Sequence, residues 1–251
     1  MEWSLDKNIA RIIVGENGPG NRLDQLSYPS DVIIDQQNND LIIADQKNRR
    51  VMRWSRQLNL SSQIVINDVD CARLAMHDDG TLYISDWKHH EVKRWKRGET
   101  LGTIVAGENG QGNQLNQLNS PSFLFIDDNH TLYISDRDNH RVMKWMRDAN
   151  EGIIVAGGNG QGDQLTQLSR PLGLKVDQFG QIYVADRDNH RVMRWREGEK
   201  EATVIVGGNG KGLKRNQLSD PFGLSIDNEG HLYVTDCGNH RIQKFERDLI
   251  N

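Results

Sequence analysis

The chain has 251 residues, of which 36% are hydrophobic and 26% are charged, and its formal net charge is −4. This length suits one large all-β domain or two ordinary domains, and it needs no disulfide framework to build a core. No apolar run approaches the roughly 18 residues of a membrane-spanning helix, and the mild acidity argues against nucleic-acid binding by the surface as a whole.

The first fifteen residues lack the basic start and the apolar stretch of a secretion signal. We therefore expect a soluble chain with no signal peptide, in a compartment that the sequence does not identify. The two cysteines, Cys71 and Cys237, are too few for a disulfide framework, and we expect both to be unpaired.

One pattern recurs five times along the chain. The tripeptide Asn-His-Arg begins at residues 139, 189 and 239, and diverged copies stand at 48–50 and 89–91. Each copy follows an aspartate by three residues and precedes an aromatic residue by six. The aspartates are Asp45, Asp86, Asp136, Asp186 and Asp236. Five copies that keep one internal register indicate a repeat architecture.

Each copy has the pattern of four short strands. In the fourth copy these strands are 172–177, 181–186, 190–195 and 202–207, and Pro171 stands where a strand can begin. Turns rich in Gly, Asn and Asp separate them, and no stretch shows a sustained helical period. Four-stranded units of about 40–50 residues without helices are typical of propeller blades.

Residues 171–195, with the sequence PLGLKVDQFGQIYVADRDNHRVMRW, combine a Pro and Gly start, two strands that end in aspartate, and an Asn-His-Arg turn before a third strand. This pattern resembles the NHL repeat, and residues 221–245 match it nearly as well. The resemblance covers essentially the whole chain and implies an all-β fold, a β-propeller of four-stranded NHL-type blades. It implies no single function, because NHL propellers serve several unrelated ones.

We predict one domain over residues 1–251, with blades at approximately 29–67, 71–107, 121–157, 171–207 and 221–251. The last blade lacks a fourth strand, whereas the chain opens with a strand of the fourth type at 10–15. We therefore expect five blades closed by this N-terminal strand, which would pair with 241–246 and remove an exposed edge. Residues 1–4 resemble the end of a third strand, so an incomplete six-bladed propeller remains the alternative.

The repeated polar residues are expected to serve blade geometry. The aspartates are predicted to cap turns by accepting backbone N–H groups two or three residues later. The asparagines of the tripeptide, such as Asn139, are predicted to hold the left-handed position of the turn, and the histidines after them to be structural. The glycine-rich loops, such as 157–162, lack the surroundings of a phosphate-binding loop and are predicted to connect blades.

The second blade departs from the repeat. It lacks the glycine-rich loop and the proline, and its turn contains Trp87, His89 and His90. The missing loop is expected to leave a notch on the face that carries the blade connections. Trp87 is predicted either to anchor a partner there or to fold over the shortened loop.

The first strands begin at the mouth of the central channel, where Asp31 and Arg73 fall on neighbouring blades and are expected to form a salt bridge. Asp31 is the one inward carboxylate at this level, which argues against a channel metal and so against an enzyme. A zinc site could form only by convergence of histidines across blades, so we predict no metal and no cofactor. The histidines that break the repeat are His77, His89, His90, His130 and His231.

Two clusters of cations form the other asymmetry. They comprise Lys47, Arg49 and Arg50 in the first blade's turn, and Lys211, Lys214 and Arg215 in the loop that enters the last blade. If five blades close, these clusters are expected to form one patch for an anionic partner, and otherwise they are two solvated groups.

The leading hypothesis is a non-enzymatic binding scaffold that contacts a protein through the loop-bearing face. The alternative is RNA binding through the basic patch on that face, as the resemblance to NHL domains of tripartite-motif proteins implies. A hydrolase or lyase with a metal in the channel is the least favoured hypothesis. We therefore expect a monomer with a protein partner, with RNA as the second possibility and no membrane.

Overall fold

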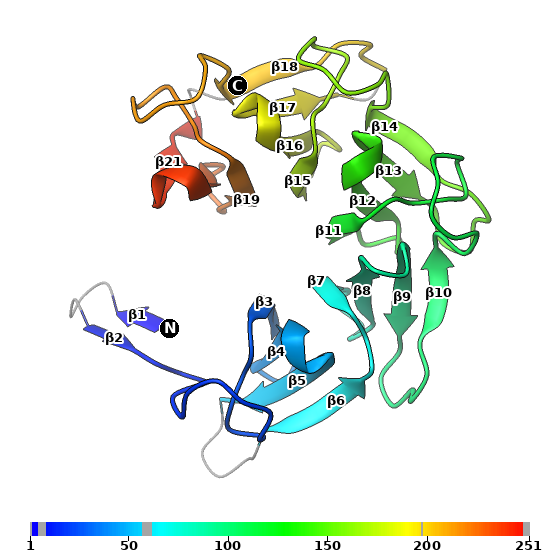
Figure 1. Ribbon diagram of the computed structural model, residues 1–251, viewed down its shortest axis with the longest axis vertical. Coiled ribbons are helices and arrows are strands. Elements are labelled where there is room, and N and C mark those ends of the chain that lie inside the picture. Colours follow the sequence, from blue (N-terminus) through cyan, green and yellow to red (C-terminus); the bar gives the residue numbers. More distant parts are fainter. Residues whose placement is uncertain (1, 5–8, 57–61, 197, 248–251) are drawn as a thin grey trace.

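The computed structural model describes residues 2–4, 9–56, 62–196 and 198–247, and this part of the chain is all-β. Strands β3 to β21 form five antiparallel sheets arranged in a ring, and these sheets are the blades of a β-propeller (Figure 1). The expected all-β propeller of five blades is confirmed. The described helices are 3-10 turns of three residues, and none is long or apolar enough to cross a membrane.

The strands of each blade follow one another in sequence. Blade 1 contains β3 (Pro29–Asp35), β4 (Asp40–Asp45), β5 (Arg50–Ser55) and β6 (Gln63–Asn67). Blade 2 contains β7 (Cys71–Met76), β8 (Leu82–Asp86), β9 (Glu91–Trp95) and β10 (Thr103–Ala106). Blade 3 contains β11 (Pro121–Ile126), β12 (Leu132–Asp136), β13 (Arg141–Trp145) and β14 (Ile153–Gly157). Blade 4 contains β15 (Pro171–Val176), β16 (Ile182–Asp186), β17 (Arg191–Trp195) and β18 (Thr203–Gly207), and blade 5 contains β19 (Pro221–Ile226), β20 (Leu232–Asp236) and β21 (Arg241–Phe245).

Hydrophobic side chains pack mainly between neighbouring blades. The first strand of each blade is innermost and contacts the first strand of the next, from β3 and β7 to β15 and β19 (Figure 1). Between blades 3 and 4, Val142 and Leu168 pack with Val184 and Trp195. Because a blade exposes an apolar face on each side, its neighbours stabilise it by covering both.

Three repeated polar residues hold the loop that enters a blade, and we call them the Asp–Asn–Arg clamp. In blade 4 the fully buried Asp186 accepts the backbone N–H of Ser169 at 2.7 Å. Its other oxygen accepts bonds from Asn189 Nδ2 at 2.8 Å and Arg191 Nε at 2.7 Å. The Arg191 guanidinium also donates to the backbone carbonyls of residues 163, 164 and 167 in the loop. The same aspartate bonds recur at Asp45, Asp136 and Asp236.

Two predictions about this turn are wrong in detail. The clamp aspartates accept a backbone N–H that lies 17 residues earlier, or 18 at Asp45, not two or three later. The left-handed residue is the histidine, with φ of 55° at His140, while Asn139 lies inside the 3-10 turn and donates its side chain to the aspartate. His140 Nδ1 also accepts the backbone N–H of Arg170 at 3.1 Å, so the repeated histidine links one blade to the next, and its predicted structural role is confirmed.

Blade 2 has neither the glycine-rich loop nor the arginine that would bind it. Glu91 stands at the position of the clamp arginine and forms an ion pair with Lys93 at 2.6 Å. Asp86 accepts the backbone N–H of His89, three residues later, so this single blade follows the predicted capping pattern. Blade 2 therefore lacks both the glycine-rich loop and the arginine that holds this loop in the other blades.

The N-terminal strand does not close the ring. Strand β2 (Ile9–Arg11) pairs with β1 (Glu2–Ser4) in a separate two-stranded sheet. Within the described residues the sheet of β19, β20 and β21 has three strands, and β21 lies apart from β2 (Figure 1). The prediction that residues 10–15 complete the last blade is therefore wrong. Pairing with the adjacent β1 closes a short loop, which costs much less entropy than pairing with the opposite end of the chain.

Two blade faces that would meet in a closed ring are exposed instead. On β21, Ile242 is 71% exposed, whereas Val192 at the same position of blade 4 is fully buried. On β3, Val32 is 56% exposed, whereas Leu174 at the same position of blade 4 is 5% exposed. Blades 1 and 5 therefore each carry an apolar face that is largely exposed, and at blade 1 only a few N-terminal residues such as Ile13 and Val14 lie beside it among the described residues.

Both cysteines are free, as predicted. Cys71 begins β7 and is fully buried, and this burial raises the pKa of its thiol to about 12. Because a thiol reacts as the thiolate, Cys71 is a packing residue at neutral pH. Cys237 is exposed in the turn after β20.

Candidate binding surface at the channel mouth

The first strands of all five blades begin around a depression of about 530 Å³. Its lining also includes the first residues of the turns that follow β4, β8 and β12. The blade connections lie at this same end of the strands, so the hollow occupies the centre of the loop-bearing face. The side chains that define it are Arg73, Trp87, Phe123, Arg137 and Phe222.

Arg73 crosses the centre of the depression. Its guanidinium carbon lies 4.4 Å from the ring centroid of Phe123 in blade 3 and 4.9 Å from that of Phe222 in blade 5. The two rings meet edge to face at 5.4 Å, and Arg73 Nη1 donates to the carbonyl oxygens of Ser30 and Ala72. Burial lowers the pKa of Arg73, yet the cation keeps aromatic faces and carbonyls as partners. Arg73 thereby joins blades 1, 2, 3 and 5.

The predicted salt bridge between Asp31 and Arg73 is not formed among the described ion pairs. Asp31 instead accepts the backbone N–H of Leu74 at 2.9 Å and that of Val32 at 3.0 Å. Burial raises the pKa of the Asp31 carboxyl, and the bond from Leu74 acts in the opposite direction. Asp31 therefore links blade 1 to the backbone of blade 2, while its neighbour Arg73 is held by stacking.

Trp87 stands on the rim of the depression. It follows β8 directly, and 42% of its surface is exposed. One part of the indole lines the hollow and the rest faces solvent. In the other blades this position is Gln46, Arg137, Arg187 or Cys237.

His89 and His90 serve the turn of blade 2. His89 Nδ1 lies 2.9 Å from Asp86 Oδ2, so His89 takes the place of the clamp asparagine. His90 holds the left-handed position with φ of 58°, and its Nδ1 accepts the backbone N–H of Ser120 at 2.9 Å. The two residues therefore support the rim, and His89 remains half exposed.

The six cations do not form the predicted single patch of free charges. Arg50 is a buried clamp residue, and Arg49 pairs with Asp68 and Asp70 at 2.5 and 2.6 Å. Lys211 pairs with Asp220 at 2.9 Å. Lys47 lies 4.9 Å from the ring centroid of Tyr28, and Lys214 and Arg215 are exposed. The two clusters were expected to meet only if residues 10–15 paired with 241–246, and the chain does not form this pairing.

Phe123 and Phe222 are the residues at the mouth that sequence reasoning did not select. Phe123 has the repeat position that Arg73 has in blade 2, but its contact with blade 5 depends on how strands converge across the channel. The available signal was a bulky aromatic residue where blade 4 has Gly173. A Cβ at Gly173 would lie 2.5 Å from the backbone oxygen of Phe222, so the channel leaves no room for a side chain there.

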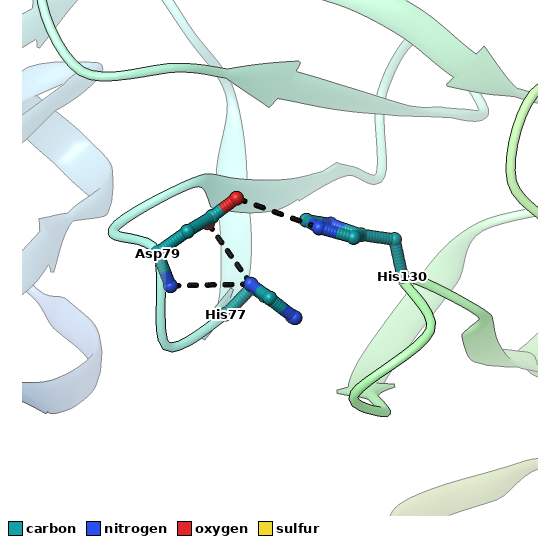
Figure 2. Close-up of side chains that lie close together, drawn as sticks. All are labelled: His77, Asp79 and His130. Atoms are coloured by element: carbon teal, nitrogen blue, oxygen red, sulfur yellow. Dashed lines mark hydrogen bonds and ion pairs between the residues drawn. The ribbon is translucent and has the colours of Figure 1, made fainter.

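Three groups of described side chains place their ligand atoms within 4.8 Å of one another, as a metal site requires. They are His77, Asp79 and His130; Asp70, Asp86 and His89; and Asp227, Glu229 and His231. None of these residues lines the depression. The first group joins blades 2 and 3 (Figure 2), which is the convergence across blades that the sequence alone does not reveal.

Comparison with known proteins supports the fold assignment. No curated protein matches the sequence. Among solved structures, an auxiliary nutrient binding protein from Bacteroides thetaiotaomicron VPI-5482 is 17% identical, with a TM-score of 0.69 over 88% of this chain and 59% of that chain. This chain thus spans less than two thirds of that protein's length.

Two further structures share the fold. A chain of a nidogen/laminin complex is 19% identical, with a TM-score of 0.68 over 89% of this chain and 77% of that one. A gluconolactonase from Xanthomonas campestris is 15% identical, with a TM-score of 0.68 over 90% of this chain and 75% of its own. At these identities the likeness concerns the fold alone.

The sequence profile of the NHL repeat matches residues 168–194 and 218–245, which contain the first three strands of blades 4 and 5. Blades 1 and 3 carry the same clamp and the same four-stranded order. The chain is therefore a β-propeller that carries NHL repeats in blades 4 and 5.

Proposed function

We propose that the chain is a binding scaffold that engages a protein partner through the channel mouth, with Trp87 as its anchor. The observation that carries this proposal is a half-exposed tryptophan on the rim of a depression of about 530 Å³. Tryptophan is among the residues that dominate the binding energy of protein interfaces, because its indole offers a large contact surface and has only two side-chain torsions to fix.

The floor beneath Trp87 is pre-organised. Arg73 is held between two aromatic rings and two backbone carbonyls, and Asp31 fixes the first strand of blade 1 to that of blade 2. A rigid surface loses little conformational entropy on association, which favours binding.

The chemistry of the lining favours binding over catalysis. The described residues that line the depression include no carboxylate and no histidine, so no general acid or base faces the hollow. The fold neighbours named above include a protein in a laminin complex, a nutrient binding protein and a gluconolactonase, so the architecture is compatible with each use. Of these three uses, the residues at the channel mouth support the first, binding within a protein complex.

The test compares Trp87→Ala with Phe179→Ala. Phe179 is also an exposed aromatic residue, at 72%, but it lies in the turn between β15 and β16 at the opposite end of the strands. For a partner captured by the immobilised chain, Trp87→Ala is expected to weaken binding by about 2 kcal/mol, roughly thirty-fold in Kd. Phe179→Ala is expected to leave the Kd unchanged.

Phe179→Ala should unfold at the wild-type temperature because Phe179 is 72% exposed, and Trp87→Ala should lose only a little stability because 42% of Trp87 is exposed. A partner that binds Trp87→Ala as tightly as the wild type, or that is lost with Phe179→Ala, would contradict the proposed face.

A further inference from the structure

The strongest unexplained cluster lies at the end of blades 2 and 3 that is opposite the channel mouth. It consists of His77 and Asp79 in the turn after β7, and His130 in the turn after β11. Because β7 and β8 are antiparallel, this turn is a full strand length away from Trp87. The cluster is therefore independent of the proposed binding face.

His77 replaces an aspartate of the repeat. Blades 3, 4 and 5 have Asp127, Asp177 and Asp227 at this position. In blade 4 the aspartate accepts the backbone N–H two residues later at 2.9 Å, whereas His77 Nδ1 receives that of Asp79 at 3.2 Å. An aspartate carboxylate therefore forms the shorter hydrogen bond in this turn. The geometry of the turn does not account for the histidine at position 77.

His130 replaces a glycine of the repeat. Blades 2, 4 and 5 have Gly80, Gly180 and Gly230 at this position, with φ between 75° and 88°. His130 keeps the left-handed conformation with φ of 59°. Glycine adopts this region with less strain than histidine, although the repeated histidines such as His140 adopt it as well.

These two departures from the repeat meet in space. The imidazole rings of His77 and His130 stack with centroids 3.7 Å apart (Figure 2). The Asp79 carboxylate lies beside both, with Oδ1 at 3.0 Å from His77 Nδ1 and Oδ2 at 3.4 Å from His130 Nε2. Two imidazoles and one carboxylate thus present their ligand atoms to one small volume.

The outer ring nitrogens already have protein partners. His77 Nε2 lies 3.3 Å from the backbone oxygen of Asp128, and His130 Nδ1 lies 2.9 Å from the hydroxyl of Tyr83. A carbonyl oxygen only accepts, so Nε2 of His77 carries a hydrogen. Its Nδ1 accepts the backbone N–H of Asp79, beside the carboxylate of that residue, and a bound ion would replace this N–H at the lone pair. Metal-bound histidines are oriented in this way, with the distal N–H donated to a protein oxygen.

We propose that His77, Asp79 and His130 form a binding site for a divalent transition metal, with zinc as the preferred ion, that bridges blades 2 and 3. Imidazole nitrogen with carboxylate oxygen is a ligand set that zinc accepts, and three protein ligands leave the fourth position open to water. The two histidine side chains are 15% and 16% exposed and Asp79 is 49% exposed, so the ion reaches the site from solvent. Stacked rings present their lone pairs side by side, so binding includes a rotation about the soft χ2 torsion of one imidazole.

The test is calorimetric titration of zinc chloride into the metal-free full chain, repeated with cobalt(II) and read by its visible absorption. We expect one ion per chain. His130→Gly is expected to weaken binding at least roughly ten-fold, as is His77→Asn. His130→Gly restores the residue that three other blades carry, so its unfolding temperature should equal or exceed that of the wild type without zinc.

Two control variants separate this site from the other groups. His89→Asn and His231→Gln each introduce the residue that another blade has at that position, Asn139 and Gln181, and both should bind zinc as the wild type does. A wild-type chain that binds no zinc would overturn the proposal. Zinc binding that survives His130→Gly, or that is lost only with His89→Asn or His231→Gln, would do so as well.

Discussion

Asp186→Ala is expected to destabilise the folded chain by about 3–5 kcal/mol. Asp186 is fully buried and is bound by Ser169 N–H, Asn189 and Arg191, of which the arginine side chain is 7% exposed. Burial raises the pKa of Asp186, so the ion pair itself adds little net stability. Removing the carboxylate, however, leaves Arg191 as a buried charge without its counter-ion. Urea-induced unfolding of the full chain measures the loss.

Asp86→Ala provides the matched control in blade 2. This aspartate is equally buried, but its described partners are the backbone and side chain of His89, which is half exposed and can be hydrated. The expected loss is about 1–2 kcal/mol, the cost of unpaired hydrogen-bonding groups. Equal losses in the two variants would show that the arginine clamp contributes nothing beyond a capped turn.

Val192→Ala is expected to cost about 2 kcal/mol, whereas Ile242→Ala at the equivalent position of blade 5 is expected to be nearly neutral. Val192 is fully buried in the cluster that joins blade 4 to blade 5, with Leu218 and Val234. Ile242 is 71% exposed, because no described strand or blade covers β21 on that side. The free energy of unfolding of both variants, measured in urea, gives the comparison.

A large loss for Ile242→Ala would mean that something covers the outer face of blade 5 in solution. That result would contradict the open ring and would favour closure by the N-terminal strand or by another polypeptide. Unchanged stability for both variants would instead contradict the packing of blades 4 and 5.

The repeat and its strands could be predicted from sequence because both depend on local patterns. Alternating apolar residues, turn glycines and the 50-residue register fix where strands start and end, and the strands of blade 4 begin and end within two residues of the predicted ones. The roles of Asp186 and Asn189 were structural, as expected. Their bonding partners were missed, because Ser169 and the loop carbonyls approach only when the chain folds back on itself.

Closure of the ring was predicted wrongly because one strand pattern fits two partners. Residues 10–15 have the pattern of a fourth strand, and both β1 and β21 have that of a third. Pattern alone does not rank these partners, whereas loop-closure entropy favours the adjacent one. The convergence of His77 and His130 was likewise out of reach, since it depends on how neighbouring blades meet. The sequence did single out both residues as histidines that break the repeat.

The most direct test of the central claim is site-specific crosslinking. A photoreactive amino acid is introduced at position 87 in one variant and at position 179 in another, and each is irradiated with the captured partner. The account predicts covalent adducts from position 87 and none from position 179. Adducts from position 179 alone, or in equal yield from both positions, would contradict a binding face at the channel mouth.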